Sequence, residues 1–217
     1  GKGSNERRTV QGSGGTLQQA DAGNMTSLKI NNTAITTRWQ GYYGNITGII
    51  VLDDASNNTI YSWKIASPQG EIYAVNHSTT PTWANVKCLN FSAGNEQNIS
   101  LANLNTGIGL TSNTDRESFN QTFNLTYQGG FSVGTTAITA GNQCPLVSLY
   151  VSDAYDEAKF NVTLLHQNQS KDMVIYAAIV EQQATGFSGA SLDFQMIVGE
   201  NGDIVGATNY YFYVELT

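Results

Sequence analysis

Few side chains in this sequence have the types and spacing that enzymatic chemistry requires. The two histidines, His77 and His166, lie in or beside N-x-S/T triplets, and we expect both at the surface. No nucleophile elbow, HExxH, P-loop or GxGxxG pattern occurs. A glycosidase needs two carboxylates that face each other across a cleft, and none of the 17 acidic residues is marked out as such a pair. The sequence favours a protein that is not an enzyme, with a carbohydrate hydrolase as the enzyme class that stays open.

Acidic residues gather at two places where other roles are open to them. Asp53 and Asp54 lie in a predicted hairpin turn, where aspartate is favoured because its side chain hydrogen-bonds to nearby backbone. Asp153, Asp156 and Glu157 could bind calcium through their oxygens, although their spacing matches no defined calcium loop. We predict no cofactor and no metal, and the calcium site at these three residues is left open.

The two cysteines, Cys88 and Cys144, lie far apart and lack CxxC spacing. One structural disulfide is the favoured interpretation, because other features of the sequence indicate a location outside the cell, where such bonds persist. Two buried free thiols are the alternative.

The most frequent motif is the N-x-S/T triplet, the acceptor for N-linked glycans. It occurs eleven times, whereas 22 asparagines and 40 serines and threonines in 217 residues would give roughly four by chance. The alternative explanation is a charge-poor β surface that needs Asn and Thr for its own solvation. We predict that the glycosylated residues are Asn24, Asn31, Asn45, Asn57, Asn76, Asn90, Asn98, Asn120, Asn124, Asn161 and Asn168.

Composition excludes several partners. Charged residues make up only 12% of the chain, so amides, hydroxyls and attached glycans must supply most of the contact with water. The net charge of −7 argues against a nucleic-acid partner, which would need clustered Lys and Arg. No apolar run approaches the length of a membrane span. The first residues lack the apolar core of a signal peptide, so we expect any leader to have been removed.

The elements that carry these sites are predicted to be β-strands. Recurrent turn signals without a sustained helical period are typical of an antiparallel β-sandwich, Ig-like or jelly-roll-like, with about ten strands. We expect residues 38–53 to form a strand buried on both faces, paired with 59–65 in a hairpin whose aromatic face lies in the core. Core packing is favoured over a sugar-stacking platform for the three tryptophans, Trp39, Trp63 and Trp83.

Later segments give further strand predictions. Residues 119–127 alternate aromatic and polar side chains and are predicted to be a strand with Asn120 and Asn124 on its solvent face. In residues 160–165, Asn161 and Thr163 are expected to point outward. Residues 173–180 are predicted to be a central strand, and 192–198 and 210–216 to be strands, with a hairpin turn at Asn201-Gly202. Residues 92–117 are predicted to be a long irregular connection.

Domain organisation follows from these patterns. Residues 1–23 are polar, rich in Gly and Ser and without periodicity, so we expect a flexible N-terminal extension. Residues 24–217 are expected to form a single β-sandwich domain. Within it, 24–36 gives only a weak strand pattern.

The segments WQGYYGNITG, SWKIASPQGEIYA, DFQMIVGENG and YYFYVEL resemble those of a group of archaeal secreted cell-surface proteins. The resemblance covers Thr37 to Leu216, and its first, second and fourth segments match closely. It implies an archaeal envelope or extracellular location and no enzymatic role.

We therefore expect a heavily N-glycosylated, extracellular structural subunit of a pilin-like surface filament, whose partners are copies of itself. Such subunits can assemble by donor-strand complementation, in which an extended segment of one copy completes the sheet of the next. The donor candidate is Met25–Ile35, with Met25, Leu28, Ile30 and Ile35 as its apolar residues. The competing interpretation makes this segment the first strand of its own domain. The alternative function is a non-polymerising surface or S-layer-associated adhesin or carbohydrate-binding module.

Overall fold

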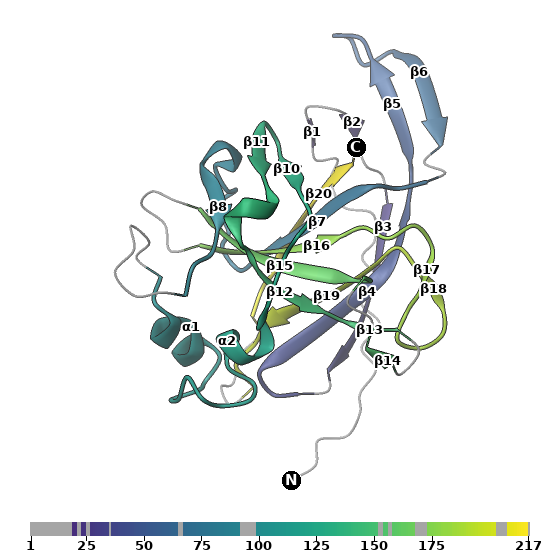
Figure 1. The fold of residues 1–217 in the computed structure, drawn as a ribbon. Helices are drawn as coiled ribbons and strands as arrows, with labels where there is room; N and C mark the ends of the chain where they lie inside the picture. The colour runs from purple at the N-terminus through teal and green to yellow at the C-terminus, as the bar shows by residue number, and fades with distance from the viewer. Residues whose placement is uncertain are drawn as a thin grey trace.

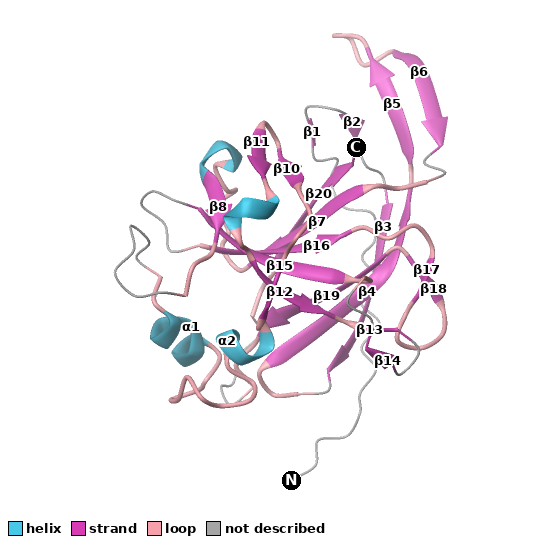
Figure 2. Ribbon diagram, viewed as in Figure 1, coloured by secondary structure: helices cyan, strands magenta, loops and turns pink. Residues whose placement is uncertain are grey.

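The computed structural model shows a mostly antiparallel β protein in which two sheets face each other (Figures 1 and 2). It describes residues 19–20, 23–24, 27–34, 36–64, 67–91, 99–151, 154–155, 158–167, 173–202 and 208–216. The prediction of an antiparallel all-β fold is confirmed.

The larger sheet has seven strands. Its order is β20-β7-β16-β15-β12-β9, and β8 pairs additionally with β15. The strands span β7 Gly70–Val75, β8 Val86–Cys88, β9 Leu125–Thr126, β12 Pro145–Ser148, β15 Asn161–Gln167, β16 Val174–Ile179 and β20 Tyr211–Leu216. Every residue of β16 except Ile179 is buried, which confirms the predicted central strand.

Two short strands share the edge of β15 that lies opposite β16. Strand β12 pairs with the first half of β15 and β8 with the second half, where Cys88 lies opposite Leu165. Cys144 immediately precedes β12, and the predicted disulfide between Cys88 and Cys144 is present. The disulfide therefore ties together two strands that belong to the same edge but are 56 residues apart.

The second sheet has the order β19-β4-β3. Its strands span β3 Ser27–Ala34, β4 Trp39–Thr47 and β19 Phe194–Gly199. It packs on one face of the large sheet through a core that includes Trp39, Ile46, Phe194, Met196 and Val198. Most of the strand predicted at 192–198 lies in β19.

The other face of the large sheet is also covered. A hairpin of β10 (Phe131–Val133) and β11 (Thr136–Ile138), together with the 3₁₀ turn η1 (Trp83–Asn85), encloses a second core on that side. Because the large sheet is buried on both faces, its central strands lack a polar side. Thr163, predicted to point outward, is fully buried, and its hydroxyl donates to the backbone oxygen of Pro145 at 3.0 Å.

A two-stranded arm formed by β5 (Ile49–Asp53) and β6 (Thr59–Lys64) projects from the body (Figure 1). The hairpin is as predicted, but its expected burial is wrong, because Leu52, Ile60 and Tyr61 are 54%, 66% and 61% exposed. Asp54 accepts from the backbone nitrogens of Ser56 and Asn58 at 2.8 and 2.9 Å, which confirms its turn role.

The remaining elements are short. The paired strands are β1 (Gln19–Ala20) with β2 (Gly23–Asn24), β13 (Tyr150–Val151) with β14 (Ala154–Tyr155), and β17 (Ala184–Thr185) with β18 (Ser191–Leu192). The helical elements are α1 (Leu101–Gly107), α2 (Phe119–Thr122) and the 3₁₀ turn η2 (Ala140–Asn142).

The predicted strand over residues 119–127 is wrong. Its first part is helix α2, and only Leu125 and Thr126 form a strand. Phe119 and Phe123 are both buried; a spacing of four residues places side chains on one face of a strand and also on one face of a helix. The aromatic spacing therefore could not distinguish the two.

Two connections also differ from prediction. Residues 92–117, predicted to be irregular, contain helix α1, which begins after Ser100 because the Ser100 hydroxyl accepts from the backbone nitrogen of Asn103. The turn at Asn201-Gly202 does not close a hairpin, because β19 pairs with β4 whereas β20 pairs with β7.

We predict that replacing both cysteines with alanine (Cys88→Ala with Cys144→Ala) lowers the free energy of unfolding by about 3–5 kcal/mol, because the bond closes a long loop in the unfolded chain. Urea unfolding of the variant and of the oxidised parent measures the difference. Equal midpoints would show that the pairing of β8 and β12 with β15 holds this edge without the bond.

Candidate functional site: a tyrosine-lined pocket

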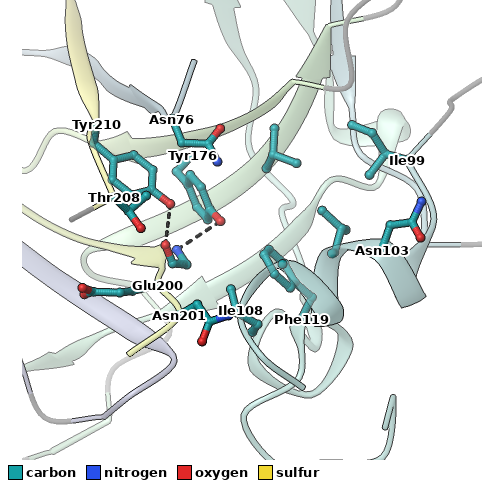
Figure 3. Close-up of a pocket in the computed structure, with 14 residues that line it drawn as sticks. Asn76, Ile99, Asn103, Ile108, Phe119, Tyr176, Glu200, Asn201, Thr208 and Tyr210 are labelled. Atoms are coloured by element: carbon teal, nitrogen blue, oxygen red, sulfur yellow. Dashed lines mark hydrogen bonds between the residues drawn. The ribbon is translucent and has the colours of Figure 1, made fainter. Parts of the chain in front are cut away.

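A pocket of about 320 Å³ opens at one end of the two sheets, beside helix α1 (Figure 3). Its residues come from β16, the end of β19, both helices, and the segments that follow β7 and β19 or precede α1 and β20. They are Asn76, Ile99, Asn103, Leu104, Gly107, Ile108, Phe119, Val174, Tyr176, Gly199, Glu200, Asn201, Thr208 and Tyr210. The volume lies at the lower end of the range of small-molecule sites.

Two tyrosines hold the end of β19 at one wall. The Tyr176 hydroxyl accepts from the backbone nitrogen of Gly199 at 3.1 Å, and the Tyr210 hydroxyl donates to the Gly199 carbonyl oxygen (Figure 3). The two rings meet edge to face with centroids 6.0 Å apart. The close approach requires glycine, since a Cβ at residue 199 would lie 2.8 Å from both the Tyr176 hydroxyl and Ile108 Cγ2.

Both phenols are neutral at neutral pH, and burial extends the pH range in which they stay so. It raises the pKa of Tyr176 to about 12, and it raises the pKa of Tyr210 further, with a contribution from the neighbouring Tyr176. The two hydroxyl groups are therefore hydrogen-bonding groups at neutral pH and do not act as bases.

A buried amide joins the helices that form the opposite wall. The side-chain oxygen of Asn105 in α1 accepts from the backbone nitrogen of Phe119 at 2.9 Å, and its side-chain nitrogen donates to Asn113 at 2.8 Å. Asn105 is only 1% exposed, so these partners satisfy polar atoms that water does not reach. The hydrogen bond from Phe119 to Asn105 fixes α1 against the start of α2.

The helices are anchored to β4 through Arg38 and Trp39. Arg38 donates to the Ile108 carbonyl oxygen at 3.2 Å, and the Trp39 indole nitrogen donates to the Glu117 carbonyl oxygen at 2.9 Å. The Trp39 ring also packs edge-on against Phe119, with centroids 5.0 Å apart. The pocket therefore lies between parts of the chain that are each held to the core.

The rim of the pocket is polar and carries little charge. Among its described residues, amides come from Asn76, Asn103 and Asn201, a hydroxyl from Thr208, and the single charged group is the carboxylate of Glu200. With no Lys or Arg among those lining residues, the pocket disfavours anions. Aromatic walls below an amide-rich rim suit a neutral ligand with one apolar face and several hydroxyls, which is the character of a sugar.

The structure places the predicted glycosylation residues in three environments. Five of them have exposed side chains: Asn45, Asn57, Asn76, Asn90 and Asn124. Asn120 and Asn161 are partly buried, Asn120 in helix α2 and Asn161 with its side-chain oxygen accepting from the Ser148 hydroxyl at 2.6 Å, so the outward placement predicted for Asn161 is only partly right. The side chains of Asn24, Asn31, Asn98 and Asn168 lie outside the described residues.

Other predicted residues have mixed outcomes. His77 is exposed, but His166 is 2% exposed, which contradicts its predicted surface position, and burial lowers its pKa. Trp39 is buried, and Trp83 packs between Tyr73 and Tyr213, as predicted for core tryptophans. The Trp63 side chain lies outside the described residues.

The possible calcium ligands Asp153, Asp156 and Glu157 also lie outside the described residues. Within the part of the chain that is described, no group of three or more His, Cys, Asp or Glu side chains is placed to hold a metal.

An acid pair that the sequence did not mark out lies on the other face of the large sheet. Glu71 and Glu215 are directly opposite each other on β7 and β20. Glu215 accepts from the Tyr73 hydroxyl at 3.1 Å and from the backbone nitrogen of Gly134 at 3.0 Å. Gly134 lies in the turn of the β10–β11 hairpin, so Glu215 is tied to that covering hairpin and is not held ready for a substrate.

Glu71 differs from its partner. It is 6% exposed, and its Oε2 has no hydrogen-bond partner among the described residues. Burial, followed by the charge of Glu215, raises the pKa of Glu71 to about 7. Glu71 is thus a buried carboxyl group that binds a proton more tightly than an ordinary glutamate does.

The chain matches no protein-family model, no curated protein and no solved structure. No helix among the described residues combines the length and apolar character needed to cross a bilayer.

Sequence reasoning missed the residues that shape the pocket. Tyr176 was hidden in a continuous apolar run and Tyr210 in an aromatic one, although a buried tyrosine hydroxyl does require a hydrogen-bond partner. Nothing in the sequence identifies Gly199 as that partner, because it lies 23 residues from Tyr176.

We predict that Gly199→Ala lowers the free energy of unfolding by about 1–3 kcal/mol, because the added methyl group overlaps Tyr176 and Ile108. Gly107→Ala is the matched control: it lines the same pocket, and its Cβ would meet nothing within 4 Å. Helix propensity should make that control neutral or stabilising by up to about 1 kcal/mol. Thermal and urea unfolding test both, and a destabilised Gly107→Ala with an unaffected Gly199→Ala would contradict the assigned packing.

We also predict that Glu71 contributes more to stability in mild acid than at neutral pH. The folded-state pKa of Glu71, about 7, exceeds its ordinary value of 4.5, so the folded protein binds this proton more tightly than the unfolded chain. Its contribution is complete below pH 4.5 and is lost as the pH rises through 7. Glu71→Gln should remove this part of the pH dependence of the melting temperature, whereas Glu117→Gln, in the turn before α2, should leave it in place.

Proposed function

We propose that the protein is an N-glycosylated, extracellular structural subunit of an archaeal surface filament, in which copies join by exchange of a β-strand. Its partners are other copies of itself and its attached glycans. In this role the chain is not a catalyst.

The observation that carries the proposal is the projecting arm. Among the described residues five large hydrophobic side chains are exposed, and three of them, Leu52, Ile60 and Tyr61, lie on β5 and β6. The two arm strands pair with each other alone among the described strands, so each offers an edge for further pairing. Exposed apolar groups beside open strand edges favour association with another chain.

The surface chemistry supports an extracellular location. The disulfide is typical of secreted proteins, and a chain with 12% charged residues gains solubility from glycans on exposed asparagines. The segments that resemble archaeal surface proteins fall on strands of both sheets, with WQGYYGN in β4, DFQMIV at β19 and YYFYVEL at β20.

Strand β3 gives a route to assembly. Its eight residues pair along β4 of the same chain, from Ser27 opposite Thr47 to Ala34 opposite Gln40. In this arrangement the donor candidate is a strand of its own domain, which was the alternative to donating it to another copy. The same pairing made between two copies would retain every β3–β4 contact, and the short connection after Ala34 is the place where exchange would open the chain.

The tyrosine-lined pocket favours a second candidate function. A site with aromatic walls, an amide rim and no described cation suits a carbohydrate, which would make the protein a surface adhesin or carbohydrate-binding module that does not polymerise.

Paired cysteines at residues 34 and 40 distinguish the assemblies. Ala34→Cys with Gln40→Cys places two thiols at directly opposed positions of β3 and β4, where a disulfide can form. If copies exchange β3, oxidised filaments should give a ladder of covalent multimers on a non-reducing gel. Electron micrographs of the same sample report whether filaments are present.

The single variant Ala34→Cys is the control, because it should give no ladder beyond dimers. Filaments whose cross-links all lie within one chain would overturn strand exchange of β3. Native material without filaments under the microscope would overturn the structural role and leave the binding module.

A further inference from the structure

The acceptor triplet Asn76-His77-Ser78 begins at the mouth of the tyrosine-lined pocket. Asn76 directly follows β7, has an exposed side chain and lies at the rim beside Tyr176 (Figure 3). Among the described residues that line the pocket, the other asparagines are Asn103 and Asn201, and neither begins an N-x-S/T triplet. A glycan on Asn76 would therefore start where the cavity opens.

The lining fits the first sugar of such a glycan. A pyranose ring has a C–H face that packs on aromatic rings, and the partly exposed ring of Tyr210 is the one open to it, since Tyr176 and Phe119 are only 4% and 2% exposed. Its hydroxyls exchange hydrogen bonds with amides and carboxylates. Asn103, Asn201 and Glu200 bring those groups to the rim. The described lining has no cation, so a neutral sugar is favoured over a phosphate or an acidic sugar.

We propose that the glycan attached to Asn76 folds back and places its proximal sugar in this pocket. This inference rests on the glycosylation proposed above. Tethering matters because a ligand on a short flexible linker has an effective concentration of the order of millimolar. A pocket with only weak affinity for free sugar is then filled by its own glycan.

Filling the pocket has a consequence for stability. The glycan contacts Tyr210 and α1 together only in the folded protein, and a ligand that binds the folded state alone stabilises it. The glycan on Asn76 differs in this respect from one on Asn124, which is exposed and does not line the pocket. It is a structural part of the site as well as a solubilising group.

The test compares variants made in a host that adds N-glycans. Asn76→Gln and Ser78→Ala each remove the acceptor triplet, and Asn124→Gln removes a different one. Intact mass shows which glycans are present and lost. We expect both changes at the Asn76 triplet to lower the melting temperature by about 2–4 °C more than Asn124→Gln does. In unglycosylated protein from a bacterial host, Asn76→Gln should have no such effect.

A double-mutant cycle identifies the pocket as the place of contact. Asn103→Ala removes an amide from the rim at an exposed position of α1. In the glycosylated protein, Asn103→Ala should lower the melting temperature. In the Asn76→Gln background, which lacks this glycan, the same change should not lower the melting temperature. Equal effects of Asn103→Ala in both backgrounds would overturn the inference while leaving glycosylation intact. A mass that shows no glycan at Asn76 would overturn the proposed glycosylation at this residue and the inference with it.

Discussion

The burial of β15 and β16 on both faces is the constraint on which the structure depends. With the β19-β4-β3 sheet on one side and the β10–β11 hairpin on the other, all residues of these strands are buried except Asn161 and Ile179, which are partly exposed. Every polar group there needs an internal partner, and the hydroxyl of Thr163 finds one in Pro145. The edge of β15 is completed by two short strands, β8 and β12, and the disulfide joins the points where they meet.

The pocket results from the same requirement for polar satisfaction. Tyr176 belongs to the central strand and carries a hydroxyl into the core, where the backbone of Gly199 accommodates it. In the helices, the side-chain oxygen of Asn105 accepts a hydrogen bond from the first backbone nitrogen of α2. The buried Tyr176 hydroxyl and Asn105 amide both need hydrogen-bond partners, and these bonds fix the walls of the pocket. The pocket therefore has a defined shape although short helices form part of it.

Sequence patterns predicted the buried strands whose apolar residues follow one another along the chain. The central strand at 173–180, the strand at 192–198 and the disulfide were predicted correctly, because apolar runs and cysteines have few other uses in such a chain. The strand predicted at Phe119 failed because its aromatic spacing fits a helix equally well. His166 and Glu71 are buried by strands from distant parts of the chain, and the pocket depends on a contact between Tyr176 and Gly199. Such non-local contacts leave no mark on a single sequence.

The arm also has a mechanical meaning. Strand β5 continues from β4, which belongs to the smaller sheet, and β6 leads into β7, which belongs to the larger one. A pull on the tip of the arm is therefore divided between both layers of the body. Each layer resists through a ladder of backbone hydrogen bonds along the strand that receives the load, so tension reaches the whole body at once and is not concentrated on a single edge.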